Sequence, residues 1–171
     1  PESMAVTGPL TARQAERLLW RAGTGPRPGQ VAAMTGMDAR DAVLSLTRVP
    51  ATLTFSGPAG SNGAWPFTPL HAWGHDHCVW LDRMVRADQP LVERMALVFH
   101  DWFATKRSST DAVFAQDQVQ LFRDHGLGTF DNLLTRVTKD PAMLLFLDGI
   151  HNTKNNPNEN YAREVMELFT L

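Results

Sequence analysis

The stretch NPNENYAREVMELFTL, residues 156–171, combines a helix start signal with an amphipathic pattern. Asn156 can accept a hydrogen bond from an unpaired backbone N–H, and Pro157 suits the first helical position because its φ is preset. Glu159 stands where a capping box has an acidic residue. At about 100° per residue, the apolar side chains fall on one arc and the polar ones on the other. We therefore expect a helix from Asn156 whose buried face consists of Tyr161, Ala162, Val165, Met166, Leu168 and Phe169.

The polar face of this helix has two interpretations. Asn160, Glu164 and Glu167 stand at i, i+4 and i+7, and Arg163 can pair with a glutamate one turn away. An amide and two carboxylates on one strip are suited to bind a divalent cation or to act as an acid/base pair. The alternative is a solvated face with i,i+4 ion pairs. The loop before the helix, which includes Asn158, contains four asparagines and favours a binding site beside the helix N-terminus.

Residues 91–104 are apolar almost all round, so we expect them to form a central buried helix. The few polar side chains of this segment are costly to bury unless they have partners. Glu93 and His100, two turns apart on one side, have two explanations. One is ion pairing between helices. The other is a carboxylate–histidine site shared with Glu164 and Glu167, which would hold a divalent metal or perform acid/base chemistry.

A cluster of histidines precedes residue 80. Thr68 and Pro69 suit a helix start, and a helix from that point would place four potential zinc ligands on one face. These are His71, His75, Cys78 and Asp82. Against a zinc site, structural zinc is usually held by two chain segments and not by one helix. The alternative is a set of surface histidines without a metal.

The rest of the chain reads as short helices joined by glycine- and proline-containing turns. Helices are expected at about residues 11–22, 28–35, 38–48, 111–125, 130–139 and 141–148, with caps at Thr11, Asp38, Thr129 and Asp140. Residues 50–69 differ, because they hold four prolines, three glycines and no charged residue. The aromatic side chains of this segment predict an ordered loop, which either packs over the core or forms a partner surface at residues 53–67.

Several of these segments together resemble one known family. PNENYAREVMELFTL looks like the signature of the bacterial "domain of unknown function 1800" family. Four further segments resemble segments of this family and follow one another in the same order as in the family. They are RLLWRAGTGPRPGQ at 17–30, WLDRM at 80–84, ERMALVFHDWFAT at 93–105 and LFRDHGLGTFDNLLTRVTKDPAMLLFLD at 121–148. The resemblance implies a fold but no established reaction. Family members are usually longer, so we expect residues 1–171 to be the N-terminal portion of a longer domain.

The composition narrows the class of protein further. The chain has 171 residues, 43% of them hydrophobic and 20% charged, as in ordinary globular domains. A formal net charge of −2 gives no bulk attraction for nucleic acid or for an anionic membrane, and no apolar run is long enough to span a bilayer. The single Cys78 cannot form an internal disulfide. No export signal is visible, so we expect a cytoplasmic protein, although an exported mature form would read the same.

From these patterns we expect an all-α fold, with seven to nine short helices arranged compactly around residues 91–104 as a single domain. For function, we favour a non-catalytic structural or interaction domain in which the polar residues form a buried lattice. Its partner would be another protein or the remaining C-terminal part of the same polypeptide. The alternative is a metal-binding or acid/base enzyme with a divalent metal as cofactor, centred on Glu93, His100, Arg163, Glu164 and Glu167, with Asn158 and Asn160 binding.

Overall fold

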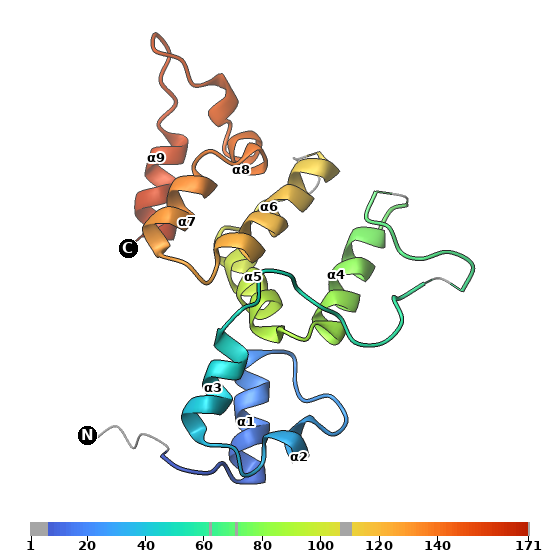
Figure 1. The fold of residues 1–171 in the computed structure, drawn as a ribbon. Coiled ribbons are helices and arrows are strands. Elements are labelled where there is room, and N and C mark those ends of the chain that lie inside the picture. The colour runs from blue at the N-terminus through green and yellow to red at the C-terminus, as the bar shows by residue number, and fades with distance from the viewer. Residues whose placement is uncertain (1–6, 62, 71, 107–110, 171) are drawn as a thin grey trace. The chain divides into compact units, whose positions relative to one another are not determined.

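The computed structural model describes residues 7–61, 63–70, 72–106 and 111–170. Within these ranges every regular element is a helix, and strand-like pairing is limited to four isolated bridges (Figure 1). The all-α class and the expected number of helices are confirmed. The α-helices are α1 (Ala12–Ala22), α2 (Gln30–Met34), α3 (Ala39–Thr47), α4 (His75–Arg86), α5 (Pro90–Trp102), α6 (Ala112–His125), α7 (Phe130–Val137), α8 (Pro141–Phe146) and α9 (Asn160–Glu164).

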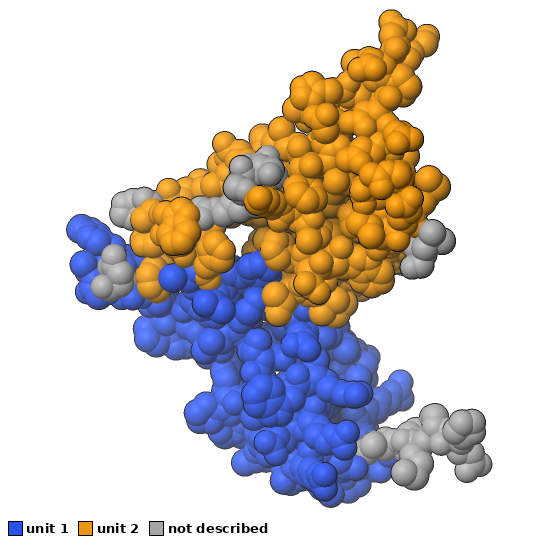
Figure 2. Space-filling view, turned by 180° about the vertical axis from the view of Figure 1, so that it is seen from behind, with its two compact units in different colours: residues 1–66, 78–94 blue, residues 67–77, 95–171 orange. Residues whose placement is uncertain are grey.

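The chain forms two compact units. Unit 1 comprises residues 1–66 and 78–94, and unit 2 comprises residues 67–77 and 95–171 (Figure 2). Two helices, α4 and α5, therefore contribute residues to both units. No helix in the described part of the chain is long and apolar enough to cross a membrane.

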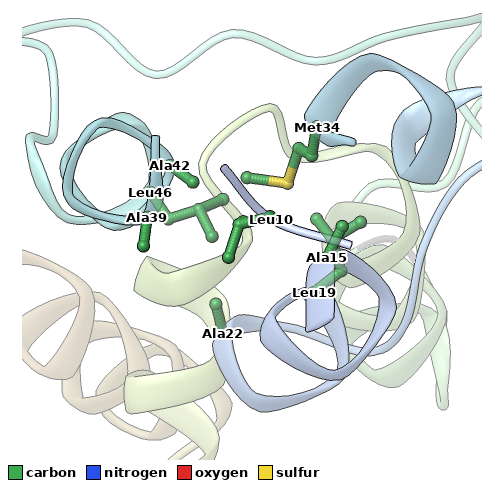
Figure 3. Packing of buried hydrophobic residues seen from close by; sticks show 8 residues of the cluster. All are labelled: Leu10, Ala15, Leu19, Ala22, Met34, Ala39, Ala42 and Leu46. Atoms are coloured by element: carbon green, nitrogen blue, oxygen red, sulfur yellow. The ribbon is translucent and has the colours of Figure 1, made fainter. Parts of the chain in front are cut away.

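Unit 1 has a small core between its first three helices. The side chain of Thr11 accepts a hydrogen bond from the N–H of Gln14, and the Gln14 side-chain oxygen accepts one from the Thr11 N–H, so a capping box starts α1. Asp38 caps α3 through the N–H of Arg40. Both caps agree with the sequence prediction. The inward side chains pack as one cluster, shown in Figure 3: Leu10, Ala15, Leu19, Ala22, Met34, Ala39, Ala42 and Leu46.

The core of unit 2 is built around a phenylalanine cluster. Phe103, which is fully buried, has four other phenylalanine rings with centroids 5.1–6.3 Å away. These distances are typical of favourable aromatic pairs. The cluster joins α5, α6, α7 and the end of the chain, and its members are Phe99, Phe103, Phe122, Phe130 and Phe169.

A buried polar chain lies in the same unit. Asp140 is the N-cap of α8, and its Oδ2 accepts hydrogen bonds from the Met143 N–H (2.9 Å) and from the Gln118 amide (2.7 Å). The Gln118 carbonyl oxygen in turn accepts from the Thr105 hydroxyl (2.7 Å). Burial raises the pKa of Asp140, while the hydrogen bond from Met143 opposes that rise. The sequence indicates the cap correctly, because Asp140 directly precedes Pro141.

The C-terminal helix begins later than expected. The structure starts α9 at Asn160, so the predicted start at Asn156 is wrong. Asn156 instead forms a tight turn with Thr153, in which each backbone N–H donates to the other residue's carbonyl (3.1 and 3.2 Å). The Asn158 side chain then accepts from the Asn160 N–H at 2.8 Å. Asparagine and threonine hydrogen bonds of this local kind compete with helix formation, which accounts for the shift.

The predicted buried face of this helix is only partly formed, because Tyr161, Val165 and Phe169 are buried or half-buried while the other three residues are exposed. After α9 the chain continues as a π-helical turn, η3 (Val165–Phe169). Because i→i+5 bonds widen the turn, the side chains leave the arc that a regular α-helix would give them. Phe169 is buried, but Met166 is 57% exposed and Leu168 is 62% exposed.

The helix at residues 91–104 is real but less completely buried than expected. Val92, Glu93, Ala96 and Phe99 form a buried stripe along α5. The other side is open, and Leu97, Val98 and Trp102 are exposed there. The buried stripe follows the three- and four-residue spacing of an amphipathic helix. Glu93 is therefore the buried charge on α5.

Candidate functional site

Glu93 is paired with an arginine of the preceding helix. The Glu93 side chain is almost completely buried, and its Oε1 accepts a hydrogen bond from Nε of Arg83 at 2.9 Å. The Arg83 side chain is 25% exposed, so one end of this pair reaches water. A buried carboxylate requires such a partner, because the desolvation of an unpaired charge is costly. Glu93 thus has a structural partner within unit 1.

A second arginine of α4 joins that helix to the long loop. Arg86 forms a bidentate ion pair with Asp82, which lies one helical turn before it. Nε and Nη2 of Arg86 donate to the Asp82 carboxylate at 2.9–3.0 Å. Asp82 also accepts from the N–H of Gly60, and Arg86 Nη1 donates to the Gly57 carbonyl, both at 3.0 Å. The hydrogen bonds from Arg86 hold the pKa of Asp82 below its usual value against the effect of burial. The Asp82 carboxylate is therefore committed to holding the loop.

Asp88 makes a third connection between the same loop and the end of α4. Its carboxylate accepts from Ser56 Oγ (2.6 Å), Thr54 Oγ1 (2.7 Å) and Arg27 Nη2 (3.0 Å). The bonds from Ser56 and Thr54 are the main reason that the pKa of Asp88 is lowered. The backbone follows the same path, with Asp88 N–H donating to the Thr54 carbonyl. We call these ion pairs the arginine lattice; it consists of Arg27, Arg83, Arg86, Asp82, Asp88 and Glu93.

The arginine lattice makes the loop after residue 50 an ordered element. The guanidinium carbons of Arg83 and Arg86 lie 4.7 and 5.4 Å from the centre of the Phe55 ring, within cation–π range. Phe55 is half-buried, whereas Trp65 is 64% exposed. The predicted ordered loop with aromatic anchors thus packs on α4 through Phe55 and presents Trp65 to solvent.

The polar strip on the C-terminal helix forms a network of its own in unit 2. Arg163 Nη2 donates to Asn160 Oδ1 (2.8 Å) and to Glu164 Oε1 (3.0 Å), and Nη1 donates to Glu167 Oε2 (3.4 Å). The structure thus brings together four of the residues that the sequence placed on one strip. Arg163 pairs with both carboxylates, so its single positive charge offsets part of their negative charge. Arg163 and Glu167 are about half exposed, so this network resembles the ion-paired surface interpretation.

The asparagines before α9 tie the loop to the preceding helix. The Asn158 amide donates to the Asp148 carbonyl (2.9 Å), and the Asn160 amide donates to the Leu147 carbonyl (3.4 Å). Asn152 accepts from the Asn158 N–H at 3.1 Å. Asp148, the residue with φ of +60° in this region, lies at the point where the chain turns. The amides of Asn158 and Asn160 thus satisfy backbone carbonyls at the end of α8.

His100 packs against an aromatic side chain within unit 2. Its ring is half-buried and makes an edge contact with Phe122, with centroids 6.4 Å apart. Burial lowers the pKa of His100, with a smaller opposing effect from Asp101 and a small reinforcing one from His77. A lowered pKa keeps the imidazole neutral at pH 7, the form that binds metals and accepts protons.

The His100 environment predicts a pH dependence of stability. A histidine whose folded pKa lies below its unfolded value binds fewer protons in the folded state. The free energy of unfolding should therefore fall as the pH drops below about 6.5, the ordinary histidine pKa. Urea titrations of the wild type and of His100→Gln between pH 8 and pH 5, as an approximate range set by that pKa, would test this. The variant should show a flatter pH dependence, and equal slopes would contradict the prediction.

Three of the four residues considered for zinc, His75, Cys78 and Asp82, lie on α4 at i, i+3 and i+7. Gly74 adopts a φ of +85°, a left-handed conformation that ends a helical path, so α4 begins at His75 and the predicted start at Thr68 is wrong. His75 packs edge-on against Phe67 (5.3 Å), Asp82 is bound by Arg86, and Cys78 is a half-buried free thiol. His71 lies outside the described residues. Over the described residues, no group of three or more His, Cys, Asp or Glu side chains is arranged to hold a metal ion.

Sequence reasoning identified the charged residues but missed most of their partners. It named Glu93 without Arg83, because the pair joins two helices and nothing in the local spacing indicates it. Asp82 and Arg86 stand at i,i+4, a signal that could have been found. Arg27 and Asp88 are 61 positions apart, and no periodicity connects them.

The fold and the site together define an all-α protein in which arginines bind the carboxylates of Glu93, Asp82 and Asp88. The family model described as "Protein of unknown function (DUF1800)" matches residues 17–171, and the chain belongs to this family. The resemblance seen in the sequence segments is thereby confirmed. No curated protein and no solved structure matches the chain.

Proposed function

We propose that this chain is a non-catalytic helical interaction domain whose charged residues hold its shape. The observation that carries the proposal is the pairing of Glu93 with Arg83 at 2.9 Å. Glu93 is the most buried of the candidate catalytic groups, and its side chain is 2% exposed. A carboxylate that is almost completely buried and hydrogen-bonded to a guanidinium is poorly placed to meet a substrate. Glu93 therefore acts as an anchor between α4 and α5.

The other candidate residues support the same function. Glu164 and Glu167 share Arg163, and Asn158 and Asn160 donate to backbone carbonyls at the end of α8. Each of these groups has a role in keeping its segment folded. The arginine lattice also holds residues 54–60 of the loop at 53–67 against α4, and Trp65 of the same loop is 64% exposed. An anchored loop with an exposed tryptophan suits a protein partner, since tryptophan contributes strongly at interfaces.

The alternative function is a metal-binding or acid/base site. One observation favours it: His100 is half-buried, and its lowered pKa keeps the imidazole neutral and able to act as a ligand or base. In this alternative, Glu164 or Glu167 would supply the carboxylate. Arg163 would have to release that carboxylate, which costs the one charged hydrogen bond that Arg163 donates to it.

Elemental analysis of the purified chain by plasma mass spectrometry tests the two functions directly. The proposed function predicts no near-stoichiometric metal in the wild type, in His100→Ala or in Glu164→Ala. Glu164→Ala should cost at most about 1 kcal/mol of stability, because the Arg163 network is partly exposed. A metal that is near-stoichiometric in the wild type and lost in both variants would overturn the proposal and establish a metal centre.

A further inference from the structure

Unit 1 contains a cavity that none of the candidate residues above lines, apart from Arg27 of the arginine lattice. Its volume is about 170 Å³, and it lies where the end of α1 and the following loop meet α4 and the start of α5. Trp20 and Val85 form part of its wall and are 55% and 64% exposed, so the cavity opens to solvent beside apolar side chains. Thr24, Gly25, Met84 and Pro90 also line it.

The segment GTGPRPG builds this cavity through close backbone packing. Gly25 has a φ of +112°, and a Cβ at that position would lie 2.8 Å from the Trp20 ring, so only glycine allows the indole to lie over the loop. Thr24 Oγ1 donates to the Met84 carbonyl at 3.2 Å, and Arg27 Nη1 donates to the Arg86 carbonyl at 3.1 Å. These bonds fix the loop to α4. The cavity is therefore formed before any ligand arrives.

The size of the cavity indicates what it accommodates. An apolar cavity of about 150 Å³ holds a benzene molecule, whereas sites for drug-sized ligands and cofactors have about 300–1,000 Å³. A volume of about 170 Å³ thus suits one aromatic or branched aliphatic side chain. An apolar side chain of a partner is a better fit than a whole cofactor.

The exposed face of α1 beside Trp20 is basic. Arg13, Arg17 and Arg21 are exposed and stand at i, i+4 and i+8, with Arg17 one turn before Trp20. Among the described residues no carboxylate pairs with any of these three arginines within 4.0 Å. Glu16, also exposed, is the acidic residue on the same helix. The local charge of this face is positive although the chain as a whole is at −2.

We propose that the cavity and the arginine row form a docking site for an acidic peptide segment of a protein partner. An apolar side chain of the segment enters the cavity against Trp20, and carboxylates on either side of it pair with Arg17 and its neighbours. This inference rests on the proposed interaction function and names a surface for it. Tryptophan and arginine are the side chains that most often dominate such interfaces, and guanidinium groups bind carboxylates through two parallel hydrogen bonds.

Charge and shape favour a peptide over the other anionic partners. Proteins bind nucleic acids and anionic membranes through many phosphates, and the affinity rises with the number of basic residues. Only three arginines stand in this row. Neither ligand requires a cavity for one apolar side chain. An acidic peptide uses both features, because its carboxylates meet the arginines while its apolar residue fills the cavity.

The experiment is selection of peptides of about twelve residues from a random displayed library on the whole 171-residue chain, followed by affinity measurements on the selected peptides. We expect acidic peptides with one aromatic or branched apolar position. Trp20→Ala and Arg17→Glu should each weaken binding at least about tenfold, or about 1.4 kcal/mol. Arg40→Glu is the matched control, since Arg40 is exposed on α3 and lines no part of the cavity. It changes the net charge by the same amount and should leave binding unchanged.

A further variant and two competing anionic ligands distinguish the possible outcomes of this experiment. Val85→Asp places a carboxylate at the apolar mouth of the cavity, which repels an acidic peptide, so it tests the site even if Trp20→Ala disturbs the loop. Vesicles containing phosphatidylglycerol and a labelled DNA duplex serve as competing anionic probes, and tight Arg17-dependent binding of either in place of peptides would overturn the proposal. Selected peptides that bind Trp20→Ala and Val85→Asp as well as the wild type would also overturn this site, while leaving an interaction function standing. The metal measurement above decides that function independently.

Discussion

Replacing Phe103 with alanine is expected to lower the free energy of unfolding by about 3–5 kcal/mol, the range for removing a fully buried aromatic side chain. Phe103 has no exposed surface, and its ring lies within 6.3 Å of those of Phe99, Phe122, Phe130 and Phe169. These neighbours come from different segments, so they cannot easily collapse into the space that the substitution leaves. The cavity term therefore adds to the lost burial. Natural domains have only about 5–15 kcal/mol of total stability, so the variant should be severely weakened.

Guanidinium denaturation followed by far-ultraviolet circular dichroism and by tryptophan fluorescence would measure this loss. The two probes should be compared, because a chain with two compact units need not unfold in one step. Val98→Ala is the matched control on the same helix, since Val98 is exposed, and it should change stability by no more than about 0.5 kcal/mol. A Phe103→Ala variant that loses less than about 1 kcal/mol would show that the phenylalanine cluster is not a well-packed core.

Much of the fold could be predicted because it depends on hydrogen bonds between close neighbours in the sequence. Thr11, Asp38 and Asp140 each accept from a backbone N–H two or three positions later, and each starts a helix where the sequence indicates. Asp111 does the same for α6. A side chain that caps its own helix needs no information from the rest of the chain. The helix order and the all-α class follow from such signals.

The C-terminal stretch shows why a strong local pattern is not sufficient. Asn156 and Pro157 have the chemistry of a helix start, but Thr153, Asn156 and Asn158 bind nearby backbone groups instead. The sequence offers two local solutions of similar quality, and helix propensity alone does not rank them. The later π-helical turn then changes which side chains face inward. An amphipathic wheel assumes regular α-geometry and fails where that geometry ends.

The ion pairs of the candidate site could not be predicted in full, because most of them join residues of different helices and loops. The sequence marked Glu93 as costly to bury, which is correct, but its partner Arg83 comes from another helix. The sequence also kept two explanations open for Glu93, and the observed ion pair supports the lattice. Arg27 and Asp88 meet only because the loops after α1 and α4 lie together in unit 1. Pairings of this kind are a property of the tertiary structure.

Replacing Arg83 with methionine is expected to cost about 3 kcal/mol, the low end of the range for breaking a buried ion pair by removing one partner. Methionine replaces the unbranched stem of the arginine but leaves the buried Glu93 carboxylate without its guanidinium. Arg83 is 25% exposed, so some water can reach the carboxylate and limit the cost. Glu93→Leu should lower the free energy of unfolding less than Arg83→Met, because the arginine that remains is partly exposed and can be solvated by water. Measured by the same denaturation titrations, Arg83→Met should therefore be the less stable of the two single variants.

The double variant Arg83→Met/Glu93→Leu separates the ion pair from the packing around it. If the charges serve only to satisfy one another, replacing both with apolar side chains of similar volume should restore most of the stability lost in Arg83→Met, because no buried charge remains. The coupling energy of the cycle should then reach about 2 kcal/mol. A double variant as unstable as the sum of the single variants would contradict this, since it would mean that the residues act independently. Such additivity would mean that the ion pair does not explain why Glu93 is buried. A buried carboxylate, 2% exposed, without a structural role is a candidate for a functional residue.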